Sequence, residues 1–249
     1  MRPSLITLTA ALALLANAAF AGGLGEMTDA ERTAFRAEVK QYLLENPEAI
    51  MEAMQVLQDR QDKTAADRDQ QMLSENSAAI FNDPDSWVGG NPDGDVTVVE
   101  FMDYRCSYCR KAFAEVADLL KSDGNIRFVV KEFPILGEDS MTSARFAIAV
   151  RMLHGDDAYA SVHDALMTLR GSPDAATLGR LAKQFNLDLP PILALMKDDK
   201  VTAIIAANHA LAAKLNITGT PTFVIDRTML RGYVPEADMR QIVEQERAS

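Results

Sequence analysis

The sequence VTVVEFMDYRCSYCRKAFAEVADLL, residues 96–120, combines a strand pattern, a cysteine pair and a helix pattern. The run at 96–101 is β-branched and apolar, as in a buried strand. Cys106 and Cys109, the two cysteines of the chain, follow it directly, and apolar residues then recur at helical spacing. The apolar run NIRFVVKEF at 125–133 predicts a second strand. This order predicts a βαβ unit with the cysteines at the turn that starts its helix.

After this unit the sequence predicts a long helical insertion. From residue 139 to residue 216, apolar side chains recur at helical spacing. The successive segments end near Gly155 and Gly171, and the last one begins after Pro190-Pro191, which are ordinary helix start and stop signals. We therefore expect an all-helical insert at about residues 139–216.

The chain then returns to the sheet. TGTPTFVID (218–226) predicts a strand entered through a proline, and TMLRGYV (228–234) predicts a hairpin with it. PEADMRQIVEQE (235–246) predicts a terminal helix, whereas residues 83–95 are rich in Asp, Pro and Gly and predict turns. The expected fold class is α/β, with one domain at residues 83–247 and the helical insert between its second and third strands.

Residues 22–82 predict a helical arm and linker in front of this domain. Asn46-Pro47 separates two short amphipathic stretches, because asparagine caps a helix and proline suits its first turn. The polar stretch at 58–76 predicts either a solvated helix or a linker. A hairpin folded back on the domain is one alternative. The sequence favours a separate arm, since its apolar stripes are short, rich in methionine and in need of a partner surface.

The first residues have the pattern of an export signal. Arg2 precedes an apolar run from Leu5 to Ala16, and Ala19-Phe20-Ala21 is a small-x-small site that predicts cleavage after Ala21. The apolar run is shorter than the roughly 20 residues that span a bilayer. We therefore expect residues 1–21 to be a signal peptide and the mature product to be exported.

The composition limits the function classes. The chain has 25 Lys+Arg against 36 Asp+Glu and a formal net charge of −11. This acidic balance argues against a nucleic-acid partner, because phosphate binding depends on clusters of Lys and Arg. Hydrophobic residues make up 48% of the chain, enough for a core that does not depend on disulfides.

The pair Cys106 and Cys109 admits three interpretations. As a structural disulfide it would close a very short loop, which gives only about 2 kcal/mol. As a metal site it lacks further ligands at the usual spacing, although two thiolates suffice to hold Cu(I) linearly. As a reagent it is well placed, because a helix that starts at about Ser107 presents unpaired N–H groups that stabilise a thiolate at Cys106. Cys109, one turn further on, is spaced to resolve a mixed disulfide by attacking Cys106.

The motifs VVEFMDYRCSYCRKAF, VVKEFPILG, GTPTFVID and LRGYVP, in this order, resemble the DsbA family of thioredoxin-fold thiol oxidoreductases. The resemblance covers about residues 83–247. It implies a cis bond between Thr220 and Pro221, with Pro221 against Cys106 and backbone groups of Thr220 offered to the substrate. It also implies that Glu100 lies beneath the site and accepts a proton from Cys109; the alternative is a surface carboxylate at the strand end. Lys131 either pairs with Glu100 or is an ordinary strand-end lysine.

Two features depart from the strongly oxidising members of the family. The dipeptide Ser107-Tyr108 replaces their Pro-His, which predicts a milder oxidant. The helical arm resembles the N-terminal region of the ScsC proteins, which implies a homotrimer or another homo-oligomer.

The resemblance implies a periplasmic disulfide oxidase or isomerase that needs no cofactor. Its partners are exported proteins with cysteines and a membrane redox partner. A copper-binding or chaperone module that uses the same cysteines is the alternative function.

Overall fold

The protein is described from a computed structural model that covers residues 27–248, so the predicted signal peptide (residues 1–21) lies outside the described residues. The chain divides into two compact units, one up to Asp62 and one from Lys63. We call their described parts the arm unit (residues 27–62) and the sheet unit (residues 63–248).

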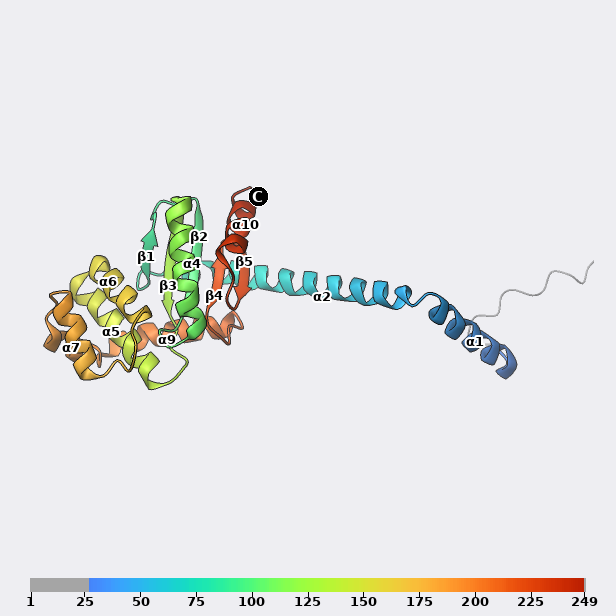
Figure 1. Cartoon of the computed structure of the whole chain (residues 1–249), viewed down its shortest axis with the longest axis horizontal. Helices are drawn as coiled ribbons and strands as arrows, with labels where there is room; N and C mark the ends of the chain where they lie inside the picture. The colour runs from blue at the N-terminus through green and yellow to red at the C-terminus, as the bar shows by residue number, and fades with distance from the viewer. Residues whose placement is uncertain (1–26, 249) are drawn as a thin grey trace, which may run out of the picture. The chain divides into compact units, whose positions relative to one another are not determined.

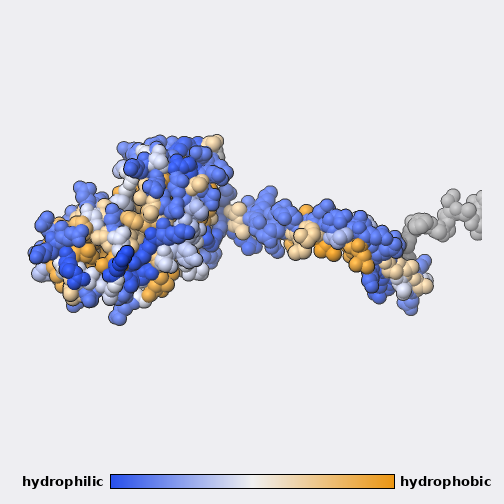
Figure 2. Space-filling view, viewed as in Figure 1, coloured by the Kyte–Doolittle hydropathy of each residue, from blue (hydrophilic) through white to orange (hydrophobic). Residues whose placement is uncertain are grey.

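The arm unit consists of α1 (Asp29–Glu45) and the first half of α2 (Glu48–Glu75). A capping box starts α1: the Thr28 hydroxyl accepts a hydrogen bond from the Glu31 N–H, and the Glu31 carboxylate accepts one from the Thr28 N–H. The helix ends before Pro47, which cannot continue its hydrogen bonds. None of the residues from 27 to 62 is buried. Figure 2 shows apolar side chains gathered along one side of this unit.

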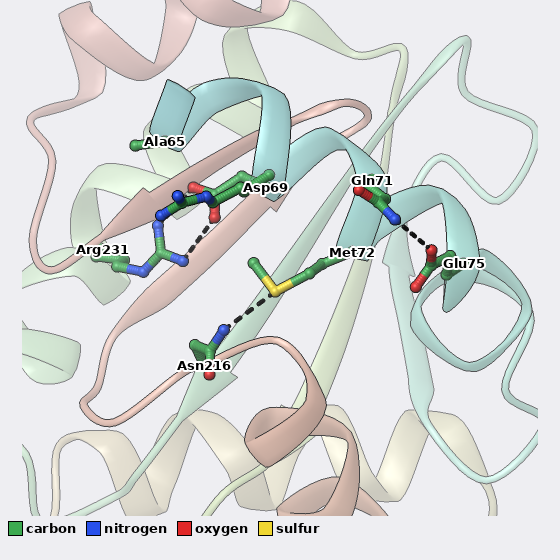
Figure 3. A pocket seen from close by; sticks show the side chains of 8 residues that line it. Ala65, Asp69, Gln71, Met72, Glu75, Asn216 and Arg231 are labelled. Carbon is green, nitrogen blue, oxygen red and sulfur yellow. Dashed lines mark hydrogen bonds and ion pairs between the residues drawn. The ribbon is translucent and has the colours of Figure 1, made fainter. Parts of the chain in front are cut away.

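The second half of α2 belongs to the sheet unit and is fastened to it by side chains (Figure 3). Arg231 forms two bonds with the Asp69 carboxylate, at 2.6 and 2.9 Å, and the Asn216 amide donates to Met72 Sδ at 3.2 Å. Leu73 is buried in the core. The polar stretch at 58–76 is therefore a solvated helix as far as Glu75, and its last residues pack on the sheet unit.

A five-stranded mixed sheet in the order β1-β3-β2-β4-β5 forms the centre of the sheet unit. β2 and β3 pair in parallel and are joined by α4, which confirms the predicted βαβ unit. β1 pairs antiparallel with β3, and β4 pairs antiparallel with both β2 and β5. The strands are β1 (Trp87–Gly90), β2 (Val96–Met102), β3 (Ile126–Glu132), β4 (Thr222–Ile225) and β5 (Thr228–Arg231).

Strand β1 lies inside the segment 83–95, where the sequence predicted only turns. Two of its four residues are glycine, so strand propensity does not reveal it. Gly89 leaves the space that the Trp87 ring occupies, and Gly90 has φ +66°, which glycine adopts without strain. The two glycines that indicated a turn therefore lie in an edge strand, where they allow close packing.

Helices surround the sheet and fill the connection between β3 and β4, as predicted (Figure 1). Among residues 27–248, no helix is both long and apolar enough to cross a membrane. The inserted helices are α5 (Glu138–His154), α6 (Asp156–Met167), α7 (Ala175–Gln184), α8 (Leu189–Leu195) and α9 (Asp199–Lys214). The others of the sheet unit are α3 (Ser77–Phe81), α4 (Ser107–Asp123) and α10 (Glu236–Arg247). The α/β class and the helical insert are thereby confirmed.

Consecutive residues of β2 contribute to two apolar clusters, because side chains alternate between the faces of a strand. Val98 and Met102 pack in the cluster that includes α4, α10 and both cysteines. Val99 and Phe101 pack in the cluster that includes α9 and Leu73 of α2. The cysteines therefore start a helix whose inner side rests on the sheet.

Candidate active site

Cys106 is the N-cap residue of α4. Its backbone N–H donates to the Asp103 carbonyl at 3.1 Å, which fixes the turn between β2 and the helix. The N–H groups of the first helical turn have no partner within the helix and stabilise a negative charge placed there. Cys109 is completely buried, whereas Cys106 keeps 7% of its surface exposed. Both cysteines are thus buried, and Cys109 lies deeper than Cys106.

The loop before β4 lies against Cys106. Cys106 Sγ donates a hydrogen bond to the Thr220 carbonyl oxygen at 3.2 Å. The Thr220–Pro221 peptide bond is cis, as the resemblance predicted. β4 pairs with β2 with Thr222 opposite Phe101, so the sheet itself brings this loop to the cysteine turn.

Glu100 is buried in the sheet unit and not on its surface. It is 2% exposed, and its Oε1 atom has no hydrogen-bond partner. Burial raises the pKa of Glu100 to about 8. Burial, and after it the charge of Glu100, raises the pKa of the Cys109 thiol. The alternative of a surface carboxylate is therefore wrong, and the acid and the inner thiol interact electrostatically.

Lys131 does not pair with Glu100. In the parallel register Phe101, not Glu100, lies opposite Lys131, so the two charged side chains point to opposite faces of the sheet. The fully buried Lys131 ammonium donates to the Asp83 carboxylate at 2.7 Å and to the Ala79 carbonyl at 2.8 Å. Both sequence alternatives for Lys131 are wrong: its buried ammonium pairs with the partly exposed Asp83 carboxylate and fastens the segment before β1.

Asp103 organises the turn in a way that the sequence did not predict. Its Oδ1 accepts from the Arg105 N–H at 2.7 Å, and its Oδ2 accepts from the N–H groups of Ile135 and Leu136 at 2.8 and 3.1 Å. Asp103 is buried. Asp103 therefore joins the cysteine turn to the loop after β3. The sequence signal for this role was the position of an acidic residue between a predicted strand and Cys106.

A second buried carboxylate, Glu132, was also missed. Its Oε1 accepts from the hydroxyls of Tyr104 at 2.8 Å and Tyr159 at 2.6 Å. The Tyr104 oxygen also lies 3.0 Å from His163 Nδ1. The sequence signal was a charged pair, Lys131-Glu132, inside the apolar run of β3.

The outer rim of the site carries an exposed aromatic side chain. Tyr108, between the cysteines, is 59% exposed, and its ring centroid lies 6.4 Å from that of Tyr233. The Lys111 ammonium lies 4.0 Å from the centroid of Tyr233, and the Tyr233 hydroxyl donates to Glu115 at 2.7 Å. Within residues 27–248, no group of three or more His, Cys, Asp or Glu side chains is arranged to hold a metal ion.

The family model described as thioredoxin matches residues 82–245, most of the sheet unit. This chain belongs to the thioredoxin family. A second model, the N-terminal domain of the copper resistance protein ScsC, matches residues 31–63, nearly all of the arm unit. The thioredoxin-like fold and the resemblance to DsbA-family and ScsC proteins are thereby confirmed.

Two solved structures illustrate the relationship. A thioredoxin-like oxidoreductase from Silicibacter pomeroyi DSS-3 is 42% identical, with 69% of this chain and 98% of that chain covered and a TM-score of 0.65. Proteus mirabilis ScsC in a transitional conformation is 27% identical, with 89% of this chain and 99% of that chain covered and a TM-score of 0.66. The match to ScsC thus covers a larger share of this chain than the match to the oxidoreductase does.

A curated relative, Na(+)/H(+) antiporter NhaA 1 from Salinispora arenicola, is 33% identical over 146 residues. The match covers 58% of this chain and 22% of the antiporter. The chain thus spans about a fifth of the length of the first curated relatives that it matches.

Proposed function

We propose that this chain is an exported thiol-disulfide oxidoreductase that forms or rearranges disulfide bonds in other exported proteins. The placement of Cys106 supports this proposal most strongly. Its sulfur lies at the N-terminus of α4 and 3.2 Å from the Thr220 carbonyl, while Cys109 is buried behind it. A sulfur at a helix N-terminus is the more reactive of such a pair, because the helix stabilises its thiolate.

In the oxidising direction, a substrate thiolate attacks Cys106 Sγ, the bond to Cys109 breaks, and Cys109 leaves as a thiolate. A second substrate thiolate then attacks the mixed disulfide. The substrate disulfide forms, Cys106 leaves as a thiolate, and two electrons have passed from the substrate to the protein.

In the rearranging direction, the Cys106 thiolate attacks a substrate disulfide and forms a mixed disulfide. Another substrate thiolate displaces it, so no net electrons move. If Cys109 attacks instead, the substrate leaves reduced and the protein becomes oxidised.

Glu100 is the proton acceptor for Cys109 in this proposal. A buried thiol must lose its proton before it attacks, and burial opposes the thiolate. The Glu100 carboxyl group is buried, lacks a partner at Oε1 and interacts with Cys109. Its ionised form, which becomes more populated as the pH approaches the raised pKa of about 8, takes the proton as the thiolate forms. The reverse transfer neutralises Cys109 when it leaves.

We further propose that the arm unit pairs with other copies of the chain, as a homotrimer or another homo-oligomer. The arm unit has an apolar hollow of about 380 Å³, whose lining includes Phe35, Val39, Leu43 and Ile50. Phe35 is 46% exposed and Leu44 72% exposed. Exposed apolar surface of this kind marks an interaction site. The match to the ScsC N-terminal domain supports a second copy as the occupant, and an oligomer favours the isomerase role.

The periplasm is the proposed compartment, with cleavage after Ala21, because thiol-disulfide chemistry of this kind acts where disulfides persist. The proposed partners are cysteine-containing exported proteins and a membrane redox partner that resets the cysteines.

A refolding assay on a scrambled-disulfide substrate tests the proposed activity. Wild type should restore the substrate, Cys106→Ser should not, and Cys109→Ser should accumulate mixed disulfides. Equal behaviour of the two variants would contradict the assigned roles. If the wild-type protein leaves the substrate unchanged but its reduced form takes up one Cu(I) per chain, the cysteines form a metal site instead.

Light scattering tests the proposed assembly. The full-length mature chain should be an oligomer, and Phe35→Glu should convert it to a monomer. Ala37→Glu adds the same charge on the same helix outside the hollow and should leave the oligomer intact. A monomeric wild-type chain would remove the main support for the isomerase role.

A further inference from the structure

Glu132 has no part in the exchange steps above, yet it is a buried carboxyl group whose hydrogen-bond partners lie far from it in the sequence. It is 4% exposed, and its Oε2 atom has no hydrogen-bond partner. Burial raises the pKa of Glu132 to about 8. A buried polar group without full hydrogen bonding destabilises the fold, and apolar residues of similar volume pack there at less cost. The arrangement therefore calls for a role besides stability.

The groups that face Glu132 are neutral hydroxyls and not cations. Tyr104 comes from the cysteine turn and Tyr159 from α6, and His163 reaches the network through the Tyr104 oxygen. Asp103 is the charged neighbour that acts on Glu132 electrostatically. Its carboxylate is already used by three backbone N–H groups. Glu132 is thus tied to its surroundings mainly through the two tyrosines.

Tyr104 transmits this contact to the cysteines. It precedes Cys106 by two positions, and its hydroxyl is held by Glu132. Its carbonyl is held from the other side, because Arg110 Nε donates to it at 2.7 Å. Arg110 follows Cys109 directly and also donates to the Leu169 carbonyl at 2.8 Å. The turn that carries the cysteines is therefore fixed at Tyr104 both to β3 and to α4.

We propose that Glu132 is a positioning residue for the reaction at Cys106, and that it acts by holding the Tyr104 hydroxyl and with it the turn that places the Cys106 sulfur at the start of α4. The inference rests on the proposed function, because Cys106 Sγ is the atom that exchanges disulfides in that proposal. Glu132 does not touch the reacting atoms.

The two tyrosines supply a matched pair of variants. Tyr104→Phe and Tyr159→Phe each remove one hydroxyl from the same Glu132 oxygen, and both rings are 1% exposed. Only Tyr104 lies on the cysteine turn. Each variant is made in the Cys109→Ser protein, so that Cys106 is the sole thiol, and the rate of its alkylation by iodoacetamide is measured.

Tyr104→Phe should slow alkylation of Cys106 by about three- to tenfold, the scale of one lost hydrogen bond. Tyr159→Phe should leave the rate within about twofold, although it should also lower the unfolding midpoint, because it too removes a hydrogen bond to Glu132. Glu132→Gln keeps an oxygen that accepts from Tyr104 and should retain most of the rate, whereas Glu132→Leu should behave like Tyr104→Phe. Equal rates for the two phenylalanine variants, or equal loss with Gln and Leu, would overturn the inference.

Alkylation does not require that the protein exchange disulfides. A wild-type chain that fails in the refolding assay but shows the predicted difference between the tyrosine variants would refute the proposed function and leave the positioning role of Glu132. Normal refolding activity with no difference between the tyrosine variants would refute only the positioning role.

Discussion

Replacing Glu100 with glutamine should change how the stability of the protein depends on pH. Glu100 is buried, and the desolvation of its carboxylate raises its pKa from 4.5 to about 8. Between these two values the folded state holds a proton on Glu100 that the unfolded chain has released. The contribution of Glu100 to the free energy of unfolding is therefore fully present below its unfolded-state pKa. This contribution is lost as the pH rises toward the folded-state pKa. Glutamine cannot ionise, so the variant lacks this loss.

The expected size follows from the shift. Each pH unit inside the window costs about 1.4 kcal/mol of unfolding free energy. From about pH 5 to about pH 7 the wild type should therefore lose roughly 3 kcal/mol through Glu100 that Glu100→Gln keeps. Glu132 is raised in the same direction, but it is present in both proteins and cancels in the difference.

Urea denaturation of the reduced proteins at several pH values measures this difference. The gap in unfolding free energy between Glu100→Gln and wild type should grow in favour of the variant as the pH rises. Glu244→Gln, an exposed position on α10, is the matched control and should run parallel to wild type. Parallel curves for Glu100→Gln would refute the argument, because they would mean that folding does not hold a proton on Glu100.

Three further predictions concern the same unit. Glu100→Gln should also slow the release of mixed disulfides by about a hundredfold, the scale of one lost proton acceptor, as followed by gel shift; an unchanged rate would contradict its role. Lys131→Met should lower the unfolding free energy by about 1 to 3 kcal/mol in urea denaturation, because the partly exposed Asp83 carboxylate loses the ammonium that it binds, and adding Asp83→Asn should recover part of that loss. Gly90→Ala should cost about 2 kcal/mol or more, since φ is +66° and the new methyl group would meet the Ile126 carbonyl. Gly124→Ala has a similar φ of +74° but open space, so a larger loss there would contradict the steric argument.

The sequence predicted the features that depend on local pattern. The strand at 96–101, the helix that begins after Cys106 and the helical insert follow from hydrophobic periodicity, and the structure has all of them. The contact between Cys106 and Thr220 spans more than half of the sheet unit, and periodicity alone does not reveal it. The family motifs supplied that pairing, because they fix which distant residues share one site.

The features that the sequence missed depend on register and on close packing. The register between β2 and β3 decides whether Lys131 faces Glu100 or Asp83. A shift of one residue would move the Lys131 side chain to the other face of the sheet. Strand β1 was hidden by Gly89 and Gly90, whose role is to make room for the Trp87 ring and for β3. Glu132 looked like an ordinary charged residue, because its tyrosine partners come from a turn and from the inserted helix α6.

The central claim is that Cys106, and not Cys109, forms the bond with the substrate. Incubating Cys109→Ser with a disulfide-containing protein substrate and mapping the cross-linked peptides by mass spectrometry tests it most directly. The account predicts a mixed disulfide through Cys106 in Cys109→Ser, and no cross-link in Cys106→Ser. A cross-link of equal yield through Cys109 in Cys106→Ser would contradict the account.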